Sequence, residues 1–407
     1  MRLGPGVLRV AVCGQAPYEA TSVKAEDGLK VAIISHVYLT RENRKNVVEL
    51  AKHADVNVVS PDRALYDVFS GSIDLPAANE TCLFSLYPLK RISGPVYFLH
   101  SGSLSFDRFG PDIVHVEYDP WSAIFWQALY CRARYAKEAK LVITVKKNTY
   151  RRYAGPAGWV KHAIAKIGER RVDRIIAASK KTADLYVRTF GVPRRKITVI
   201  HHLGTDVSLF APEPGRRRKR EGESLVVGYC GRLEAHKGIL DLLAAVEQCR
   251  AATGANLTLK CLGEGRLWER LQAHARQTEW FHVLPTVLPA GVADFLKETD
   301  IFVLPSRVLP DHEEHDAHAL LEALATGVAS IGARSGIIPE ILGDGSGLLV
   351  EPGSPDSLAA ALSTLAGDEI LRDSLGRRGR KKAIESFSLE AIARRKIQVY
   401  ENALHDR

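Results

Sequence analysis

Short apolar runs alternate with longer amphipathic stretches along most of this 407-residue chain. The first clear run, KVAIISH, starts at Lys30 and is followed by the polar segment TRENRK, the helical pattern NVVELAKHA and a second run, VNVVS, at Val56. Short, continuously apolar runs are typical of buried parallel strands. The order strand, helix, strand therefore predicts a parallel sheet covered by helices.

The pattern divides into two series of such units. The first continues through PVYFLH, DIVHVEY, LVITVK, RIIAAS and ITVIHH and ends near His202. The segment Ala211 to Glu223, rich in Pro, Gly and Arg, is typical of a linker. A second series follows, with LVVGYCGRL, NLTLKCLG, WFHVLP, DIFVLP, VASIGA and GLLVEP. We predict an α/β protein with two Rossmann-like doubly wound domains that face a central cleft.

The expected domain boundaries follow from these series. Residues 1–29 form an N-terminal extension, 30–205 the first domain, 206–385 the second domain, and 386–407 an amphipathic C-terminal helix. A chain of this length is too long for one core, which agrees with two domains.

Composition limits the cellular setting. No run approaches the roughly 18 apolar residues of a membrane-spanning helix. The six cysteines are scattered, which argues against a disulfide framework and favours a reducing, cytoplasmic compartment. The net charge of +9 is clustered at Arg170-Arg171, Arg194–Lys196, Arg216–Arg220 and Arg377–Lys382. These clusters fit solvated surface, an anionic membrane or an anionic substrate; a nucleic acid is disfavoured because no aromatic residues interleave them.

The stretch from Ile301 to Ile341 carries the candidate chemistry. A buried strand leads into the loop DHEEHDAH, a helix that ends near Gly327, a second strand and a Ser335-Gly336 turn. On one unbroken helix Glu314 and Glu322 would lie about 12 Å apart. That exceeds the roughly 5–9.5 Å of a general acid/base pair but suits two ends of an extended ligand. We therefore expect Glu322 to bind a ribose and Glu314 to reach a sugar hydroxyl.

A phosphate site is predicted at the first strand of the second series. Gly231 ends that strand, and Arg232 and Lys237 precede a helix that starts after Gly238. Each charge-assisted hydrogen bond to phosphate contributes roughly 1.5–3 kcal/mol. Two cations and a helix N-terminus can hold a diphosphate without a metal ion. Ser335 and Gly336 supply a second glycine turn nearby.

Two segments of the first domain allow more than one interpretation. His115, Glu117 and Asp119 alternate at the end of a strand and share one face, where they could ligate a metal or hydrogen-bond an acceptor. The segment Trp159 to Ile176 has the pattern of a basic amphipathic helix. It could dock on an anionic bilayer, or it could be a helix that faces the core with a solvated back.

The chain resembles the retaining glycosyltransferases of family 4, which have the GT-B fold. The resemblance rests on HHLGTDVSLF, GRLEAHKG, the GEG at Gly263–Gly265, DIFVLPS, EHDAHALLEALATG, SGIIPE and GLLVEPGSPDSLAAAL, in that order. FSLEAIARRKIQVY resembles the helix that crosses back onto the first domain in this fold. The implied reaction moves a sugar from a nucleotide-diphosphate sugar to an acceptor hydroxyl with retention of configuration, without a metal ion, a cofactor or a protein nucleophile.

The resemblance also implies roles by position. Glu314, Arg232 and Lys237 would serve catalysis, and the acceptor would be a saccharide or a lipid-linked saccharide on the inner face of the membrane. The acceptor side of the first domain would include His115, Glu117, Asn43 and Arg44. The implied donor-binding residues are Gly231, Arg232, Lys237, Gly263, Glu264, Glu314, His315, Asp316, Ala317, Glu322, Ser335 and Gly336. The family usually has glycines where this chain has His315 to Ala317, so donor selectivity should be decided there.

Other functions on this fold remain open from the sequence. A sugar-nucleotide epimerase would form product without an acceptor. A phosphorylase would need a cofactor-bearing lysine environment, which we do not identify. A non-catalytic subunit would bind the nucleotide, and Glu314→Ala would then change no transfer.

Overall fold

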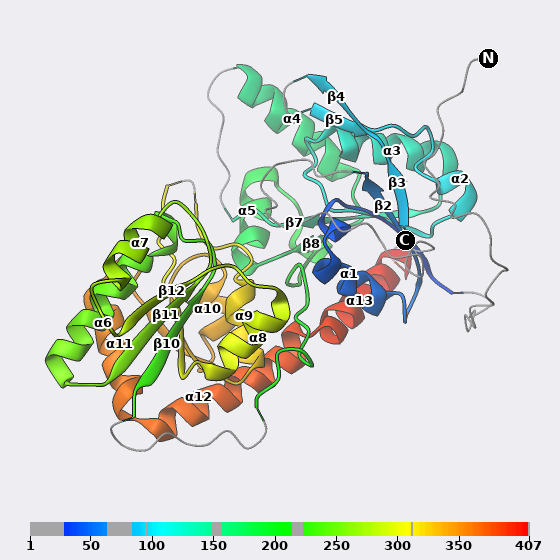
Figure 1. Ribbon diagram of the computed structural model, residues 1–407. Helices are drawn as coiled ribbons and strands as arrows, with labels where there is room; N and C mark the ends of the chain where they lie inside the picture. Colours follow the sequence, from blue (N-terminus) through cyan, green and yellow to red (C-terminus); the bar gives the residue numbers. More distant parts are fainter. Residues whose placement is uncertain are drawn as a thin grey trace, which may run out of the picture.

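The computed structural model describes residues 28–62, 84–93, 96–148, 156–213, 223–310 and 312–405. Residues 1–27 of the expected extension, most of the expected linker and the basic run Arg216–Arg220 lie outside the described residues. Within the described part, a seven-stranded and a six-stranded parallel sheet form the centres of two α/β domains (Figure 1). The predicted fold class is thereby confirmed.

The first sheet has the strand order β3-β2-β1-β6-β7-β8-β9, and each neighbouring pair is parallel. Its central strands are buried on both faces because helices cover both sides. The run PVYFLH does not join this sheet; it pairs in a separate antiparallel hairpin. The strands are β1 (Lys30–Ile34), β2 (Asp55–Pro61), β3 (Phe84–Tyr87), β6 (Ile113–Val116), β7 (Lys140–Val145), β8 (Arg174–Ala177) and β9 (Ile197–Val199), with the hairpin β4 (Leu89–Ser93) and β5 (Val96–Leu99).

Helices connect the strands of the first domain. They are α1 (Arg41–Leu50), α2 (Phe106–Phe109), α3 (Ala123–Tyr135), α4 (Pro156–Arg170) and α5 (Lys180–Phe190), with the short turns η1 (Val37–Leu39) and η3 (Arg194–Lys196). The predicted helix from Trp159 to Ile176 therefore ends at Arg170, and Arg174 already begins β8. None of the helices in the described part of the chain has the length and apolar character that crossing a bilayer requires.

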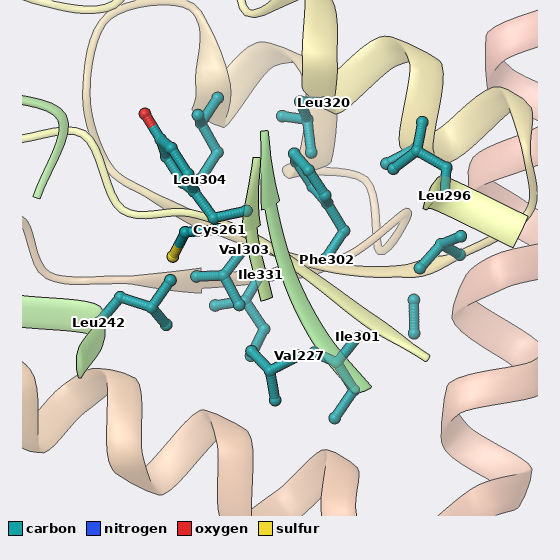
Figure 2. Close-up of a cluster of buried hydrophobic side chains, with 14 of the residues drawn as sticks. Val227, Leu242, Cys261, Leu296, Ile301, Phe302, Val303, Leu304, Leu320 and Ile331 are labelled. Atoms are coloured by element: carbon teal, nitrogen blue, oxygen red, sulfur yellow. The ribbon is translucent and has the colours of Figure 1, made fainter. Parts of the chain in front are cut away.

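The second sheet has the order β12-β11-β10-β13-β14-β15. Figure 2 shows its core, with Leu242 on one side of the strands and Leu296 and Leu320 on the other. The strands are β10 (Leu225–Cys230), β11 (Leu257–Leu262), β12 (Phe281–Leu284), β13 (Ile301–Leu304), β14 (Ala329–Ala333) and β15 (Leu348–Val350). The helices are η4 (Ala235–Lys237), α6 (Ile239–Thr253), α7 (Trp268–Ala275), α8 (Pro289–Glu298), α9 (His318–Ala325), α10 (Ile338–Leu342), α11 (Pro355–Gly367) and α12 (Glu369–Lys382).

The chain then returns to the first domain. A π-helical turn, η5 (Ala383–Phe387), links α12 to α13 (Leu389–His405). Ile392, Val399 and Tyr400 of α13 are buried in one core cluster with Val31 and Ile33 of β1. Figure 1 shows this path as one long orange-to-red course from the second domain to the first. The expected crossover helix is thus confirmed.

A buried polar cluster fixes α13 to the first sheet. The carboxylate of Glu117, just after β6, accepts hydrogen bonds from Ser35 Oγ at 2.8 Å and Tyr38 OH at 2.9 Å. His202 Nε2 lies 3.3 Å and Lys396 Nζ 3.6 Å from the same carboxylate. Burial raises the pKa of Glu117, but His202 and Lys396 outweigh burial and hold that pKa well below its ordinary value. Glu117 is therefore an ionised group whose cation comes from the C-terminal helix.

Lys396→Met should destabilise the protein by about 3–5 kcal/mol, because it leaves the buried Glu117 carboxylate without its cation. Urea unfolding measures the change. The lowered pKa of Glu117 contributes to the free energy of unfolding. This contribution is fully present above pH 4.5, the ordinary pKa of the carboxyl group in the unfolded chain, and it is lost as the pH falls from there toward the lowered pKa of the folded state. The wild-type protein should therefore lose this stability in acid.

Two variants control this prediction. Arg394→Met removes an exposed cation from the same helix and should cost less than about 0.5 kcal/mol. Glu117→Gln combined with Lys396→Met should recover part of the loss, since neither charge remains buried. A loss below about 1 kcal/mol for Lys396→Met alone would contradict the assignment of this ion pair.

Candidate functional site

The candidate site lies at the carboxyl ends of the strands of the second sheet. β10 lies between β11 and β13. The chain first adds β11 and β12 on one side of β10 and then adds β13, β14 and β15 on its other side. Open parallel sheets bind ligands outside the carboxyl ends of the strands at such a switch point. The loops after β10, β11, β13 and β14 meet here, and they contain the predicted donor-binding residues.

Glycines bring these loops into backbone contact. Gly336, after β14, has φ +53°, and a Cβ there would lie 1.7 Å from the carbonyl oxygen of Glu314. Gly238, before α6, has φ +72°, and a Cβ there would lie 2.0 Å from the carbonyl oxygen of Pro305. Only glycine fits either position. The loop between β13 and α9 is therefore clamped between the turn before α6 and the turn after β14.

Glu314 sits in the middle of this clamped loop and is paired with Lys237. Lys237 Nζ lies 2.7 Å and Ser306 Oγ 2.6 Å from Glu314 Oε2. Burial raises the pKa of Glu314, but Lys237 and Ser306 outweigh burial, so the pKa is lowered and the carboxylate stays ionised. The Glu314 N–H donates to Ser335 Oγ at 3.3 Å. Glu314 and Lys237, expected to contact different parts of a ligand, are thus one buried ion pair.

Arg232 has a different environment. It follows Gly231 at the end of β10, its side chain is exposed, and it has no ion-pair partner among the described residues. The loops after β10 and β11 are joined by Gly231 N–H to Leu262 O at 3.0 Å and by Leu233 N–H to Glu264 O at 2.8 Å. Gly263 and the main chain of Glu264 therefore support the loop that presents Arg232, while the Glu264 side chain is exposed.

Glu322 lies in α9, and Glu314 lies in the loop before it, because α9 begins only at His318. Burial raises the pKa of Glu322 to about 7, and the charge of Glu42 in α1 adds to the effect. Glu42 belongs to the first domain, so the second charge that acts on Glu322 comes from across the domain junction. The two glutamates thus occupy different elements, as the sequence predicted.

The loop from His315 to Ala317 contains polar atoms without partners. His315 Nδ1 and Asp316 Oδ1 are buried and have no hydrogen-bond partner in the described part of the protein. The His315 ring lies 5.6 Å from that of His312, which lies 4.4 Å from that of His236. Ala317 has φ +48°, a conformation that strains an alanine. Buried polar atoms without partners are rare in native proteins, so these two are candidates for ligand contacts.

The first domain holds the same loop through main-chain atoms. Asn148 Nδ2 donates to the Glu314 carbonyl oxygen at 2.9 Å, and His201 Nε2 lies 2.8 Å from the Asp316 carbonyl oxygen. Neither Asn148 nor His201 is among the site residues predicted from the sequence. His201 belongs to the quoted HHLGT motif, which offered a signal, but nothing in the pattern around Asn148 marked it.

Ionic contacts reinforce this junction. Lys181 Nζ lies 2.5 Å from Glu313 Oε1. The Glu340 carboxylate accepts the Lys180 N–H at 2.9 Å, at the N-terminus of α5, where a negative charge is favoured. The carboxyl edges of the two sheets therefore face and touch each other around the Glu314 loop.

The structure places the predicted acceptor residues differently from the expectation. His115 is fully buried, with Nδ1 2.8 Å from Tyr400 OH and Nε2 2.8 Å from Thr144 Oγ1. Glu117 belongs to the buried cluster around Lys396. Both side chains are engaged in holding α13, so neither is available to an acceptor in this structure.

The two predicted acceptor residues of α1 are bonded to the preceding turn η1. Asn43 Nδ2 donates to Val37 O at 2.9 Å, and buried Arg44 donates to Leu39 O at 3.3 Å. A half-buried lysine, Lys146 after β7, lies on this edge instead. Burial lowers the pKa of His36, and the charge of Lys146 lowers it further. Burial raises the pKa of Asp316, but His318 and then Lys146 act against burial and hold that pKa below its ordinary value. The alternative of metal ligands at His115 and Glu117 finds no support in the geometry: within the described ranges no three His, Cys, Asp or Glu side chains converge as a metal site.

Comparison with known proteins agrees with this architecture. Residues 214–382 match the family described as glycosyl transferases group 1, and residues 49–203 match glycosyltransferase family 4. The chain is 28% identical over 238 residues to the MMP α-(1→4)-mannosyltransferase of Mycolicibacterium hassiacum, covering 58% of this chain and 55% of that protein. It is 29% identical over 282 residues to the D-inositol 3-phosphate glycosyltransferase of Kineococcus radiotolerans, covering 62% of each.

These matches span little more than half the length of either relative. Both names are those of glycosyltransferases, so the epimerase alternative is not favoured.

Solved structures share the fold over nearly the whole chain. A glycosyltransferase from Rickettsia africae has a TM-score of 0.68 at 14% identity, with 94% of this chain and 100% of that chain covered. HepE of Anabaena, in complex with UDP, has a TM-score of 0.69 at 15% identity, with coverage of 92% and 100%. The two family matches together with this fold identify the chain: it belongs to the group 1 glycosyltransferases of the GT-B fold.

Proposed function

We propose that the protein transfers a sugar from a nucleotide-diphosphate sugar to an acceptor hydroxyl, with retention of configuration and without a metal ion. The acceptor is a glycan, a lipid-linked saccharide or a small molecule. The observation that carries the proposal is the Lys237–Glu314 ion pair, clamped between two glycine turns and flanked by the exposed cation of Arg232. Such a site needs a ligand with an anionic centre and hydroxyl groups on either side.

The charge at the site supports a diphosphate donor. Arg232 has no protein partner in the described residues, and Lys237 can share its donors between Glu314 and a phosphate oxygen, since an ammonium group has three. α6 begins directly after this pair and adds the positive end of its dipole. With Glu314 ionised, the two cations leave about one net positive charge, to which the α6 dipole adds, beside the roughly two negative charges of a nucleotide diphosphate. The proposed site uses these groups and no metal ion.

The contacts to the two ends of the donor are assigned to Glu322 on one side and to Glu314 with the loop from His315 to Ala317 on the other. Glu322 would accept hydrogen bonds from the two ribose hydroxyls, because its carboxylate has no hydrogen-bond partner in the described part of the protein. Glu314, His315 and Asp316 would contact the transferred sugar, where the two buried polar atoms find no partner among the residues that the structure describes. The nucleotide base stays open; UDP and UDP-glucose come first in a ligand search because HepE binds both.

Retention is proposed through substitution on one face of the sugar. The bond between the anomeric carbon and the phosphate oxygen breaks as the acceptor oxygen bonds to the same face of that carbon. The acceptor proton passes to the leaving phosphate. Glu314 is not assigned as a nucleophile, because its Oε2 is already bonded to Lys237 and Ser306. Its role is to orient the sugar and to hold Lys237 beside the phosphate.

The proposed partners include an anionic membrane surface, with the protein peripheral on the inner, cytoplasmic face. A lipid-linked acceptor would be presented there. The clustered positive charge of the chain supports this location.

Thermal shift with a panel of uridine, guanosine and adenosine diphosphate sugars tests the donor site. The matching donor should raise the melting temperature, because a ligand that binds only the folded state stabilises it by mass action. With that donor and an acceptor, NMR of the product should show the anomeric configuration of the donor, and EDTA should leave the rate unchanged. No stabilisation by any sugar nucleotide would contradict the donor site; an inverted product or activity restored only by Mg²⁺ or Mn²⁺ would contradict the mechanism.

Arg232→Met should weaken donor binding by about 10- to 150-fold, the equivalent of one charge-assisted hydrogen bond. Stability should change by less than about 0.5 kcal/mol, because the side chain is exposed and unpaired in the described structure. Isothermal titration and urea unfolding measure the two effects. Lys237→Met should instead lower both affinity and stability, since it leaves Glu314 buried without its cation. Arg276→Met, at an exposed site after α7, is the control and should change neither donor affinity nor stability.

Donor affinity should fall as the pH drops from 8 to 6. Only the ionised Glu322 carboxylate accepts two ribose hydroxyls, and its pKa is raised to about 7. Below that value, protonation should weaken binding by up to about tenfold per pH unit. Glu322→Gln should bind more weakly at pH 8 and lose this pH dependence, whereas Glu279→Gln, at an exposed site, should keep it. An unchanged pH profile in Glu322→Gln would remove Glu322 from the ribose site.

A further inference from the structure

The outer face of α4 carries large apolar side chains that no part of the described protein covers. Trp159 is 76% exposed, Val160 58% and Ile167 50%. With Ala163, they fall within an arc of about 100° on the helix. The inner face of the helix contributes Ala165, which is buried. A surface helix normally turns its large apolar residues toward the core, so α4 has the reverse arrangement.

The same face is positively charged. Lys166, Arg170 and Arg171 are exposed, and none of them pairs with an acidic group in the described residues. Glu169 is the acidic residue of this helix, and it is buried with neither carboxylate oxygen hydrogen-bonded in the described structure. Burial, with a smaller contribution from Asp119, raises the pKa of Glu169 to about 9, so it is neutral at pH 7. The positive charge of the face is therefore not offset within the helix.

The position of α4 connects this face with the cleft. Helices between parallel strands run back along the sheet, so the first turn of α4 lies toward the carboxyl edge, where the site is. Lys161 of α4 and Lys147 after β7 each lie 4.9 Å from the Trp121 ring centroid. Figure 1 shows α4 along the outer edge of the first domain, with no element of the second domain over it in that view.

We propose that the outer face of α4 docks the protein on an anionic bilayer. Trp159, Val160 and Ile167 enter the interfacial region, and Lys166, Arg170 and Arg171 contact the anionic headgroups. Aromatic and aliphatic residues beside lysine and arginine are the pattern of helices that lie in a membrane interface. The proposal rests on the proposed function in one respect: docking would bring a lipid-linked acceptor to the mouth of the cleft.

Charge favours a bilayer over a second copy of this chain. A symmetric dimer through α4 would place the same face against itself, so the unpaired cations of both copies would meet. Like charges across an interface oppose association, whereas anionic headgroups attract all three. The structure thus favours the membrane alternative over the core-facing alternative that the sequence left open.

Sedimentation with vesicles tests the proposal on the full chain at low salt. The wild-type protein should bind vesicles that contain phosphatidylglycerol and should bind pure phosphatidylcholine vesicles much more weakly. Lys166→Glu with Arg170→Glu should lower the partition coefficient by roughly tenfold or more, since each basic residue contributes about 1 kcal/mol. Trp159→Ser with Ile167→Ser should lower it as well. Tryptophan fluorescence should shift to the blue on binding and lose that shift in the Trp159 variant.

Matched controls lie in the second domain. Ile370→Ser removes an exposed apolar residue from α12, and Arg270→Glu with Arg276→Glu reverses two exposed charges on and after α7. Both should leave vesicle binding within about twofold of wild type, since charge contributions at the bilayer fall off within a Debye length. All variants should keep the wild-type melting temperature, because the altered side chains are exposed.

The outcomes separate this proposal from the proposed function. Donor stabilisation without any vesicle binding would overturn docking and leave the transferase. Vesicle binding without stabilisation by any sugar nucleotide would overturn the transferase and leave docking. Equal binding by the α4 variants and wild type would overturn the assignment to α4. A concentration-dependent dimer that the Trp159 and Ile167 substitutions dissociate, with no vesicle binding, would identify the partner as a second copy.

Discussion

The buried Glu314 carboxylate stays ionised because Lys237 and Ser306 are bonded to it. Much of the candidate site is arranged around these two contacts. The Lys237–Glu314 ion pair links the loop after β13 to the turn before α6. It therefore joins the segments that follow β10 and β13, the two strands on either side of the switch point. The glycine turns then bring the backbone of β14 against the same loop. The ligand side of the second domain is thus organised before any ligand binds, which limits the reorganisation that binding requires.

A second buried charge organises the first domain. Glu117 occupies the centre of the first sheet's carboxyl edge, but its bonds lead to Lys396 and therefore to α13 rather than to the cleft. Ser35 and Tyr38, which follow β1, are joined to Lys396 of α13 through this carboxylate. Because α13 continues from the second domain through η5, these contacts attach the last helix of the chain's path out of the second domain to the first sheet.

The sequence predicted the elements better than the contacts between them. Periodicity located most of the parallel strands, and the pattern of a polar loop followed by an apolar helix placed Glu314 in the loop and Glu322 in the helix. It could not show that Glu314 pairs with Lys237, because 77 residues separate them and only the fold brings them together. His115 and Glu117 were assigned to the acceptor side because strand ends usually face the ligand; the covering helix that buries them is nearly 300 residues away. Asn148 carried no signal, since a single amide in a loop has many possible roles.

The two domains touch at the Glu314 loop through carbonyl oxygens, which every amino acid possesses. Asn148 and His201 bind the main chain of residues 314 and 316, and the side chains at 315 and 316 are left out of that contact. Substitution of His315 therefore changes what the loop presents to a sugar, while both of these main-chain hydrogen bonds remain available. The contact between the domains and the side chains presented to a sugar thus depend on different atoms of one loop.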